Sequence, residues 1–191
     1  MALYFVSGSS RKWKEVQTIF SNASDLHQAD MDLPEIQGTP REVALAKARH
    51  AAAALKAPCF IEDTALAIHS LNGMPGPYIK HFVQALGPEK LSRLAHALAS
   101  PETPPRATAI CTIIYSPGVD CEPIIFEGGL EGQFVHPPRG VLSCNWDPVF
   151  IPDGQTLTYG EMTEEQILAN SHRFSTYNAF KKYLDENGIS Y

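Results

Sequence analysis

The chain has 191 residues, an apolar fraction of 44% and a formal net charge of −6. This length is enough for one domain or two close lobes with a sizeable core. An acidic chain without a block of lysines and arginines is a poor candidate for binding a nucleic-acid backbone, although a few placed cations can hold a nucleotide. With no signal-peptide pattern and no long apolar span, we expect a cytoplasmic protein that does not enter a membrane.

Cysteine and histidine spacings point away from disulfides and zinc. The four cysteines show no C-x-x-C spacing, which favours reduced thiols in a cytosolic protein. The seven histidines include no H-E-x-x-H motif, so the sequence indicates no zinc site.

Strand and helix patterns alternate in the first half of the chain. Residues 3–6 are typical of a buried strand, and the polar turn at 7–10 offers N-cap residues for a helix. Trp13, Val16 and Phe20 then recur at helical spacing. The remaining predicted segments of this half are an Ala-rich helix over 41–56, a helix from near Pro77, a helix from Pro88 and a Pro-rich linker between lobes at 101–105.

The second half is richer in strands. Residues 107–115 are apolar at both alternating sets of positions, which predicts a central strand. Residues 124–135 would be its partner, with a bulge or bend at Gly128 and Gly129. The last predicted elements are a short strand at 149–151 and a helix that begins after Ser171. The whole pattern predicts a mixed α/β fold with one sheet or a split sheet and helices on its faces.

Two adjacent carboxylates follow a short apolar run. Residues 59–61 predict a buried strand that delivers Glu62 and Asp63 to the rim of a sheet, where α/β proteins bind ligands. Ten residues later, two glycines and two prolines fix a turn at 73–77, and Lys80 follows. Acids for a metal, a rigid loop and a lysine together indicate phosphate chemistry. The alternative is a solvated acid pair and an ordinary turn.

Weaker signals have equally plain alternatives. Gly8 lies between a predicted strand and a predicted helix whose first turn holds Arg11 and Lys12. This arrangement is typical of an anion-binding helix start, but it could also be an ordinary helix cap. The other candidates could be surface, packing or capping residues: Glu35 on a Pro-stiffened loop, Lys47 in the Ala-rich helix, the turn at Trp146-Asp147, and Ser171-His172-Arg173 at a helix start.

Taken in order, these motifs resemble one known family. The motifs are Ser7-Gly8-Ser9-x-x-Lys12, Asp32-Leu33-Pro34-Glu35, Glu62-Asp63-Thr64, the loop over 73–80, Trp146-Asp147-Pro148-x-Phe150-x-Pro152-x-Gly154, Glu161-Met162 and Ser171-His172-Arg173. Their order and spacing are similar to those of the inosine triphosphate pyrophosphatase family (Ham1-like, non-standard purine NTP pyrophosphatases). The resemblance covers nearly the whole chain, and the loop over 73–80 is of the eukaryotic type.

The resemblance implies a fold, an activity and an assembly. The fold would be an elongated mixed β-sheet that splits into two lobes with helices on its faces, forming one nucleotide-pyrophosphatase domain over 1–191. The active site would be the cleft between the lobes. The reaction would hydrolyse ITP, dITP or XTP to the monophosphate and pyrophosphate with Mg²⁺, or Mn²⁺ in its place, and clear these nucleotides from the pool. A homodimer is expected, with Trp13 among the exposed apolar groups.

The resemblance also implies site residues, position by position. Asp63, Lys12 and Glu62 would be catalytic, with Asp63 orienting or deprotonating the attacking water, and Glu35 and Asp63 would hold the metal. The triphosphate would bind to Ser7, Gly8, Ser9, Lys12, Lys47 and Lys80. The base would bind to Trp146, Asp147, His172 and Arg173. Other substrate-binding residues would be Asp63, Thr64, Cys144 and Asn145.

Three positions depart from the family pattern. Ser9 replaces an Asn, Cys144-Asn145 replaces Phe-Gly, and Ile167 replaces a lysine. Because a stacking ring and a cation are thereby lost, we expect weaker substrate binding and altered base selectivity, with the reaction type unchanged.

Two rival functions remain open. One is a related Maf-like pyrophosphatase with a different base preference, against which Ser171-His172-Arg173 argues. The other is a nucleotide-binding protein with weak or no turnover, against which Glu35, Asp63 and Lys12 argue. A nucleic-acid-binding module is a distant third, given the charge.

Overall fold

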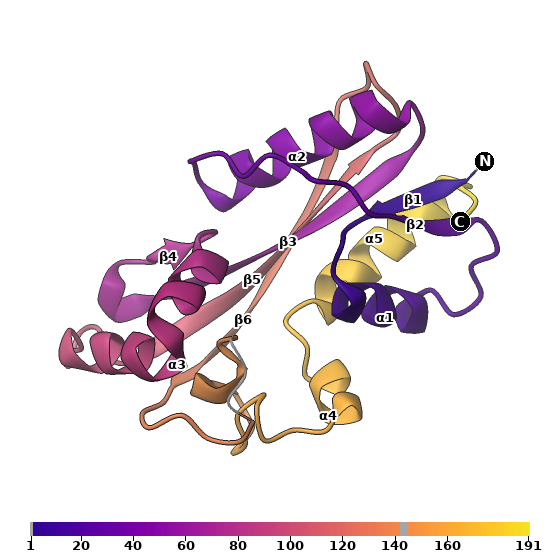
Figure 1. The fold of residues 1–191 in the computed structure, drawn as a ribbon. Coiled ribbons are helices and arrows are strands. Elements are labelled where there is room, and N and C mark those ends of the chain that lie inside the picture. Colours follow the sequence, from indigo (N-terminus) through magenta and orange to yellow (C-terminus); the bar gives the residue numbers. More distant parts are fainter. Residues whose placement is uncertain (1, 142–144) are drawn as a thin grey trace. The chain divides into compact units, whose positions relative to one another are not determined.

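The computed structural model describes residues 2–141 and 145–191, and these form a mixed α/β fold, as predicted (Figure 1). The chain divides into two compact units that are described separately below. Unit 1 comprises Met1–Asp63, Cys111–Gly128 and Ser175–Tyr191, and unit 2 comprises Thr64–Ile110 and Gly129–Phe174. The cleft between lobes stays a prediction.

The strands form one sheet in the order β2-β1-β3-β5-β6-β7, with β4 beside β3. β1 pairs in parallel with both β2 and β3, whereas β4 pairs antiparallel with β3 and β7 pairs antiparallel with β6. The bounds are β1 Leu3–Val6, β2 Leu26–Ala29, β3 Cys59–Ile68, β4 Pro75–Gly76, β5 Arg106–Ser116, β6 Ile124–Phe134 and β7 Phe150–Pro152.

The helices begin at side-chain caps or at prolines in most cases. Thr39 and Glu42 form a capping box at the start of α2, and Thr163 and Gln166 form another at the start of α4. The α-helices are α1 Ser10–Ile19, α2 Pro40–Leu55, α3 Ile79–Ala97, α4 Glu164–Ala169 and α5 Phe174–Glu186, and the 3₁₀ helices are η1 His69–Leu71 and η2 Asp147–Val149. No described helix is both long and apolar enough to cross a membrane.

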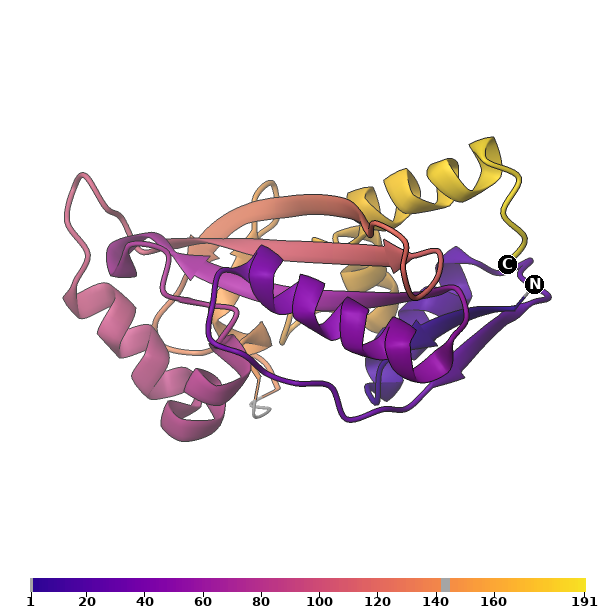
Figure 2. The ribbon, with the colours of Figure 1, turned by 90° about the horizontal axis from the view of Figure 1, so that it is seen from above.

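In unit 1, the strands alternate between two helix-covered faces. Phe60 packs with Phe180 of α5 at a ring separation of 4.9 Å, and this cluster also takes in Val16 of α1. Ile61 points to the opposite face, where it packs with alanines of α2 such as Ala48. Figure 2 shows α2 and α5 on opposite sides of the strands. Successive residues of β3 therefore face different helices.

Unit 2 has its own apolar core. The core joins the far end of β3, helix α3, the end of β6 and the segment around β7, and it is rich in aromatic rings. Its large members are Leu66, Ile68, Ile79, Val83, Leu91, Phe134, Trp146, Phe150 and Tyr159.

Two details differ from the predictions, and a third confirms them. β3 does not end before the acids but continues to Ile68, because it keeps pairing in the sheet. The prediction of one helix from near Pro77 and another from Pro88 is confirmed, because α3 consists of two helical stretches separated by the non-helical Gly87, where φ is 71°. The Pro-rich segment at 101–105 lies within unit 2, so its interpretation as a linker between lobes was wrong.

Gly128 and Gly129 lie inside β6, at the point where the chain passes from unit 1 to unit 2. β6 runs continuously from Ile124 to Phe134, and the chain passes from unit 1 to unit 2 between these glycines. A Cβ at Gly128 would collide with the Thr176 hydroxyl of α5. Close packing of α5 on β6 therefore explains why glycine is needed there.

Candidate active site

Glu62 and Asp63 leave β3 in opposite directions. The alternation of the strand places Glu62 on the face of Phe60, toward α1, and Asp63 on the face of Ile61, toward α2. β1 ends at Val6, while its partner β3 extends further, so both acids lie just beyond the carboxyl end of β1. Glu62 and Asp63 thus lie at the end of β1, as predicted for the rim of the sheet, but they lie in the middle of β3.

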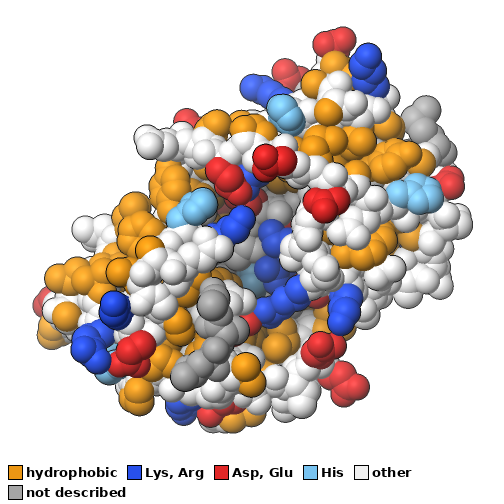
Figure 3. Space-filling model, viewed as in Figure 1, with side chains coloured by type: hydrophobic (Ala, Val, Ile, Leu, Met, Phe, Trp, Pro, Cys, Tyr) orange, Lys and Arg blue, Asp and Glu red, His pale blue; other side chains and the backbone are white. Residues whose placement is uncertain are grey.

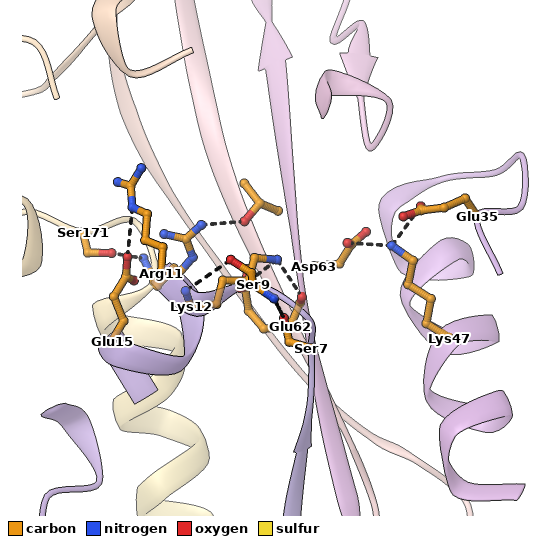
Figure 4. A network of polar contacts seen from close by, with 12 residues as sticks. Ser7, Ser9, Arg11, Lys12, Glu15, Glu35, Lys47, Glu62, Asp63 and Ser171 are labelled. Atoms are coloured by element: carbon orange, nitrogen blue, oxygen red, sulfur yellow. Dashed lines mark hydrogen bonds and ion pairs between the residues drawn. The ribbon is translucent and has the colours of Figure 1, made fainter. Parts of the chain in front are cut away.

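On the α1 face, Glu62 is paired with Lys12. The Lys12 Nζ lies 3.0 Å from Glu62 Oε2 and donates a hydrogen bond of 2.9 Å to the Glu62 carbonyl oxygen (Figure 4). The Glu62 side chain is 0% exposed. A carboxylate this deeply buried needs a charged partner, so Lys12 and Glu62 hold each other in place.

On the α2 face, the ammonium group of Lys47 joins two carboxylates. Its Nζ lies 2.9 Å from Asp63 Oδ1 and 2.9 Å from Glu35 Oε2, and its side chain is only 10% exposed. Burial lowers the pKa of Lys47, but attraction to Asp63 and hydrogen bonds to both carboxylates outweigh burial and raise its pKa above the usual range. Lys47 is therefore charged at neutral pH.

The loop between β1 and α1 is built from small residues. Ser9 is the N-cap of α1, and its Oγ accepts a hydrogen bond from the Lys12 N–H at 3.3 Å. The Ser9 N–H in turn bonds to Ser7 Oγ at 3.2 Å. A Cβ at Gly8 would lie 2.6 Å from Asp30 Oδ1, so a larger residue would have to displace that carboxylate. Unit 1 thus holds two groups of the predicted site residues: the first loop with Lys12 and Glu62 on the α1 face, and Glu35, Lys47 and Asp63 on the α2 face.

These residues fit a magnesium ion that is shared with a substrate. Among the described residues no cluster of three or more His, Cys, Asp or Glu side chains could hold a metal alone. Glu35 and Asp63, however, converge on one cation, the Lys47 ammonium group. Mg²⁺ is commonly held by one or two carboxylates together with substrate phosphates, which matches this donor set. On the face shown in Figure 3, acidic side chains (red) lie close to basic ones (blue).

In unit 2, the predicted base-binding residues are mostly buried. Arg173 donates from Nη2 to Thr64 Oγ1 at 3.0 Å. The ring of His172 lies 5.6 Å from that of Trp146, which is 6% exposed and packs edge-on against Phe150 at 5.4 Å. Trp146 therefore belongs to the core of unit 2, and its stacking on a base stays a prediction.

Asn145 and Asp147 form a short polar turn next to Trp146. Asn145 Nδ2 donates to Asp147 Oδ2 at 3.0 Å, and Asn145 Oδ1 accepts from the Trp146 N–H at 2.8 Å. Asp147 opens η2 and is half-buried. The predicted site residue Cys144 lies outside the described residues.

Three other positions named from the sequence have clear surroundings. Lys80 is exposed in the first turn of α3, after a loop in which Gly76 has a φ of 58° that favours glycine. Ile167, where the family has lysine, packs against the apolar core of unit 2. Trp13, proposed as an exposed dimer contact, is half-buried with its ring stacked on Phe5 at 6.2 Å, so it does not support the dimer.

Sequence reasoning missed two supporting residues. Tyr159 donates its hydroxyl to the Asn170 carbonyl at 2.7 Å, which anchors the segment before Ser171. Gln28 donates from Nε2 to the Ser7 carbonyl at 2.7 Å and so tethers the first loop to β2. Neither lies in a recognisable motif, and both contacts depend on tertiary packing.

Comparison with known proteins shows that the similarity covers nearly the whole chain and not only the motifs. A model described as the Ham1 family matches residues 3–183. The inosine triphosphate pyrophosphatase of Emericella nidulans is 44% identical over 180 residues and is matched over 94% of each chain. That of Mycosarcoma maydis is 44% identical over 186 residues, which is 95% of this chain and 94% of the relative. A HAM1 protein from Coxiella burnetii has the same fold, with a TM-score of 0.85, 26% identity and coverage of 97% of this chain and 100% of that one.

Proposed function

Because this chain belongs to the Ham1 family, we propose that it hydrolyses ITP, dITP and XTP to the monophosphate and pyrophosphate, which removes deaminated purine nucleotides from the pool. The enzyme would use Mg²⁺, and Mn²⁺ could substitute for it. The protein would act in the cytoplasm as a homodimer. Its relatives named inosine triphosphate pyrophosphatase support the reaction.

The arrangement on β3 is the observation that carries this proposal. Two neighbouring acids face two helices, and each acid is paired there with a lysine. Hydrolysis at the α-phosphorus needs an activated water, together with positive charge for the phosphate oxygens and the leaving pyrophosphate. Asp63 and the lysines Lys12 and Lys47 can supply both needs from unit 1.

Glu35 and Asp63 are the residues that would hold Mg²⁺. When bound, the ion would neutralise charge on the phosphate oxygens. Asp63 would also orient the attacking water and accept its proton through a carboxylate oxygen. The ion pair with Glu62 holds Lys12 in one position, which supports a role for its ammonium group in binding the triphosphate.

Unit 2 would supply recognition of the base. Hypoxanthine and xanthine carry a 6-keto oxygen where adenine carries an amino group. Arg173 and His172 would donate N–H groups to the 6-keto oxygen, whereas the adenine amino group is itself a donor and would be mismatched. The hydrogen bond to Thr64 fixes the guanidinium of Arg173, which favours such discrimination.

A substrate panel tests the function directly. The purified protein is assayed with Mg²⁺ and ITP, dITP, XTP, GTP or ATP, and pyrophosphate is measured separately from orthophosphate. We expect pyrophosphate from ITP, dITP and XTP much faster than from ATP, and no activity in excess chelator. Orthophosphate as the first product, or full activity with chelator, would overturn the proposal. A Maf-like base preference would appear in the same panel as hydrolysis of other nucleotides.

A further inference from the structure

The side chain of Asn145 is held at both ends. Its Oδ1 accepts the Trp146 backbone N–H at 2.8 Å, and its Nδ2 donates to Asp147 Oδ2 at 3.0 Å. A backbone N–H can only donate and a carboxylate can only accept, so these two partners fix which end of the amide is oxygen. Asn145 cannot flip without losing both hydrogen bonds.

The amide changes what the turn offers to a ligand. Asp147 alone would be an acceptor-only group, which attracts amino groups. Asn145 occupies Asp147 Oδ2, and its second Nδ2 hydrogen has no partner within 2–141 and 145–191. The turn therefore presents an N–H donor directly beside a carboxylate oxygen that is already bonded.

Resting on the proposed function, we propose that Asn145 is a specificity-determining residue that reads the 2-position of the purine. The 2-amino group of guanine would meet the Asn145 N–H, so that one donor would face another. The 2-oxo group of xanthine would accept the Asn145 N–H, and hypoxanthine has only a hydrogen at this position. Asn145 thus disfavours guanine nucleotides, favours xanthine nucleotides and tolerates hypoxanthine.

Two neighbours connect this turn with the predicted base pocket. Trp146, whose N–H binds Asn145, has its ring 5.6 Å from the ring of His172. His172 adjoins Arg173, the proposed partner of the 6-keto group. The Asn145 turn and the 6-keto donors thus lie in one packed region of unit 2, so that different residues could read the 2- and 6-positions.

The matched test variant is Asn145→Asp. It keeps the shape and the oxygen that accepts the Trp146 N–H but replaces the donor with an acceptor. Asn187→Asp is the control, because Asn187, just after α5, is exposed, donates from Nδ2 to the Tyr183 carbonyl and undergoes the same charge change. Asn145→Gly, which removes the amide altogether, is the second variant in case the new carboxylate disturbs folding.

Two readouts are taken for wild type and variants. The first is kcat/KM for ITP, XTP and GTP from pyrophosphate release with Mg²⁺. The second is the calorimetric Kd of IMP, XMP and GMP, which does not depend on turnover. For Asn145→Asp we expect the GTP/ITP ratio to rise and the XTP/ITP ratio to fall, each about tenfold, with the same trend in Kd. Asn145→Gly should shift both ratios in the same directions, and Asn187→Asp should shift neither.

The outcomes separate this inference from the proposed function. If wild type hydrolyses ITP to pyrophosphate but both ratios stay within twofold in Asn145→Asp and Asn145→Gly, the role of Asn145 is overturned and the function stands. Equal losses for all three nucleotides would show a merely structural residue and also overturn it. If wild type neither hydrolyses ITP nor binds IMP, both proposals fall.

Discussion

Units 1 and 2 place their polar groups in opposite ways. In unit 1, the lysines and acids pair on two faces of β3: two ion pairs join β3 to α1 or α2, and a third joins α2 to the loop of Glu35. In unit 2, the predicted site residues lie among aromatic rings, and their polar atoms bond to neighbouring hydroxyl, amide and backbone groups. The charged groups are thus concentrated in unit 1, where phosphate chemistry is proposed. In unit 2, where base recognition is proposed, packing and hydrogen bonds dominate.

This difference teaches that the two units should respond differently to mutation. Removing a charge from unit 1 leaves a well-packed scaffold and should mainly affect catalysis or ion binding. Removing a ring or hydroxyl from unit 2 should affect stability or KM, because the same groups form the core and its recognition surface. Four substitutions examine this contrast.

Trp146→Ala should have the largest effect, on stability. The ring is buried in the core of unit 2, so we expect a loss of about 3–5 kcal/mol in the free energy of unfolding. Urea denaturation followed by circular dichroism measures it. Trp13→Ala, at the half-buried ring on Phe5 of unit 1, is the comparison and should cost less. A loss below about 1 kcal/mol with a raised KM would show that Trp146 serves the ligand rather than the core.

Asp63→Asn should have the next largest effect, on turnover. The change keeps the shape of the side chain but removes the charge that holds an ion and accepts a proton from water. We expect kcat for ITP to fall by a factor on the order of a hundred or more. Glu62→Gln, which alters only the partner of Lys12, should cost less. Near-normal turnover in Asp63→Asn, with pyrophosphate as the product, would remove Asp63 from the chemistry.

Thr64→Val should raise KM more than it lowers kcat. Valine has nearly the same shape as threonine but cannot accept the hydrogen bond from Arg173 Nη2, so the guanidinium loses a fixed partner. We expect KM for ITP to rise about tenfold, with kcat less affected. Steady-state kinetics from pyrophosphate release give both constants. If kcat falls as much as kcat/KM, Thr64 acts in the chemical step and the contrast between the units fails at this position.

Lys47→Met should have the smallest effect, and it concerns ion binding without nucleotide. The ammonium group of Lys47 bridges Glu35 and Asp63, so a divalent ion held by both carboxylates, as proposed, would have to displace it. Its removal should strengthen Mn²⁺ binding by about tenfold, measured by electron paramagnetic resonance. Lys14→Met, which removes an exposed lysine of α1, is the control and should change little. Unchanged or weaker Mn²⁺ binding in Lys47→Met would contradict a shared cation position.

Local patterns predicted most elements but not all of their ends. Apolar periodicity located α1, α2, β5 and β6 within a few residues. The end of β3 was misplaced, because a strand continues as long as its neighbours pair with it, and the pairing partners are distant in sequence. Helix α4 was missed although Thr163 and Gln166 form a capping box, a signal that can be read from sequence.

The residues of the site were easier to predict from the sequence than the ion pairs that they form. Glu62 and Asp63 stood out because they are adjacent acids after an apolar run. That one pairs with Lys12 and the other with Lys47 follows from the side each takes on β3 and from which helix covers that side. Lys47 could have been a solvated lysine by sequence alone, and only the packing of α2 on β3 buries it between two acids.

The order in which the chain is synthesised acts differently on the two units. Unit 1 takes residues from both the start and the end of the chain, and Phe60 of β3 packs on Phe180 of α5. Its core therefore stays open until α5 has left the ribosome, whereas the last residue of unit 2 is Phe174. A chain cut short after Phe174 would contain every residue of unit 2 but almost none of α5, so the paired acids and lysines of unit 1 would rest on an unfinished core. Translation must reach its last helix before the proposed phosphate-binding half can become a stable fold.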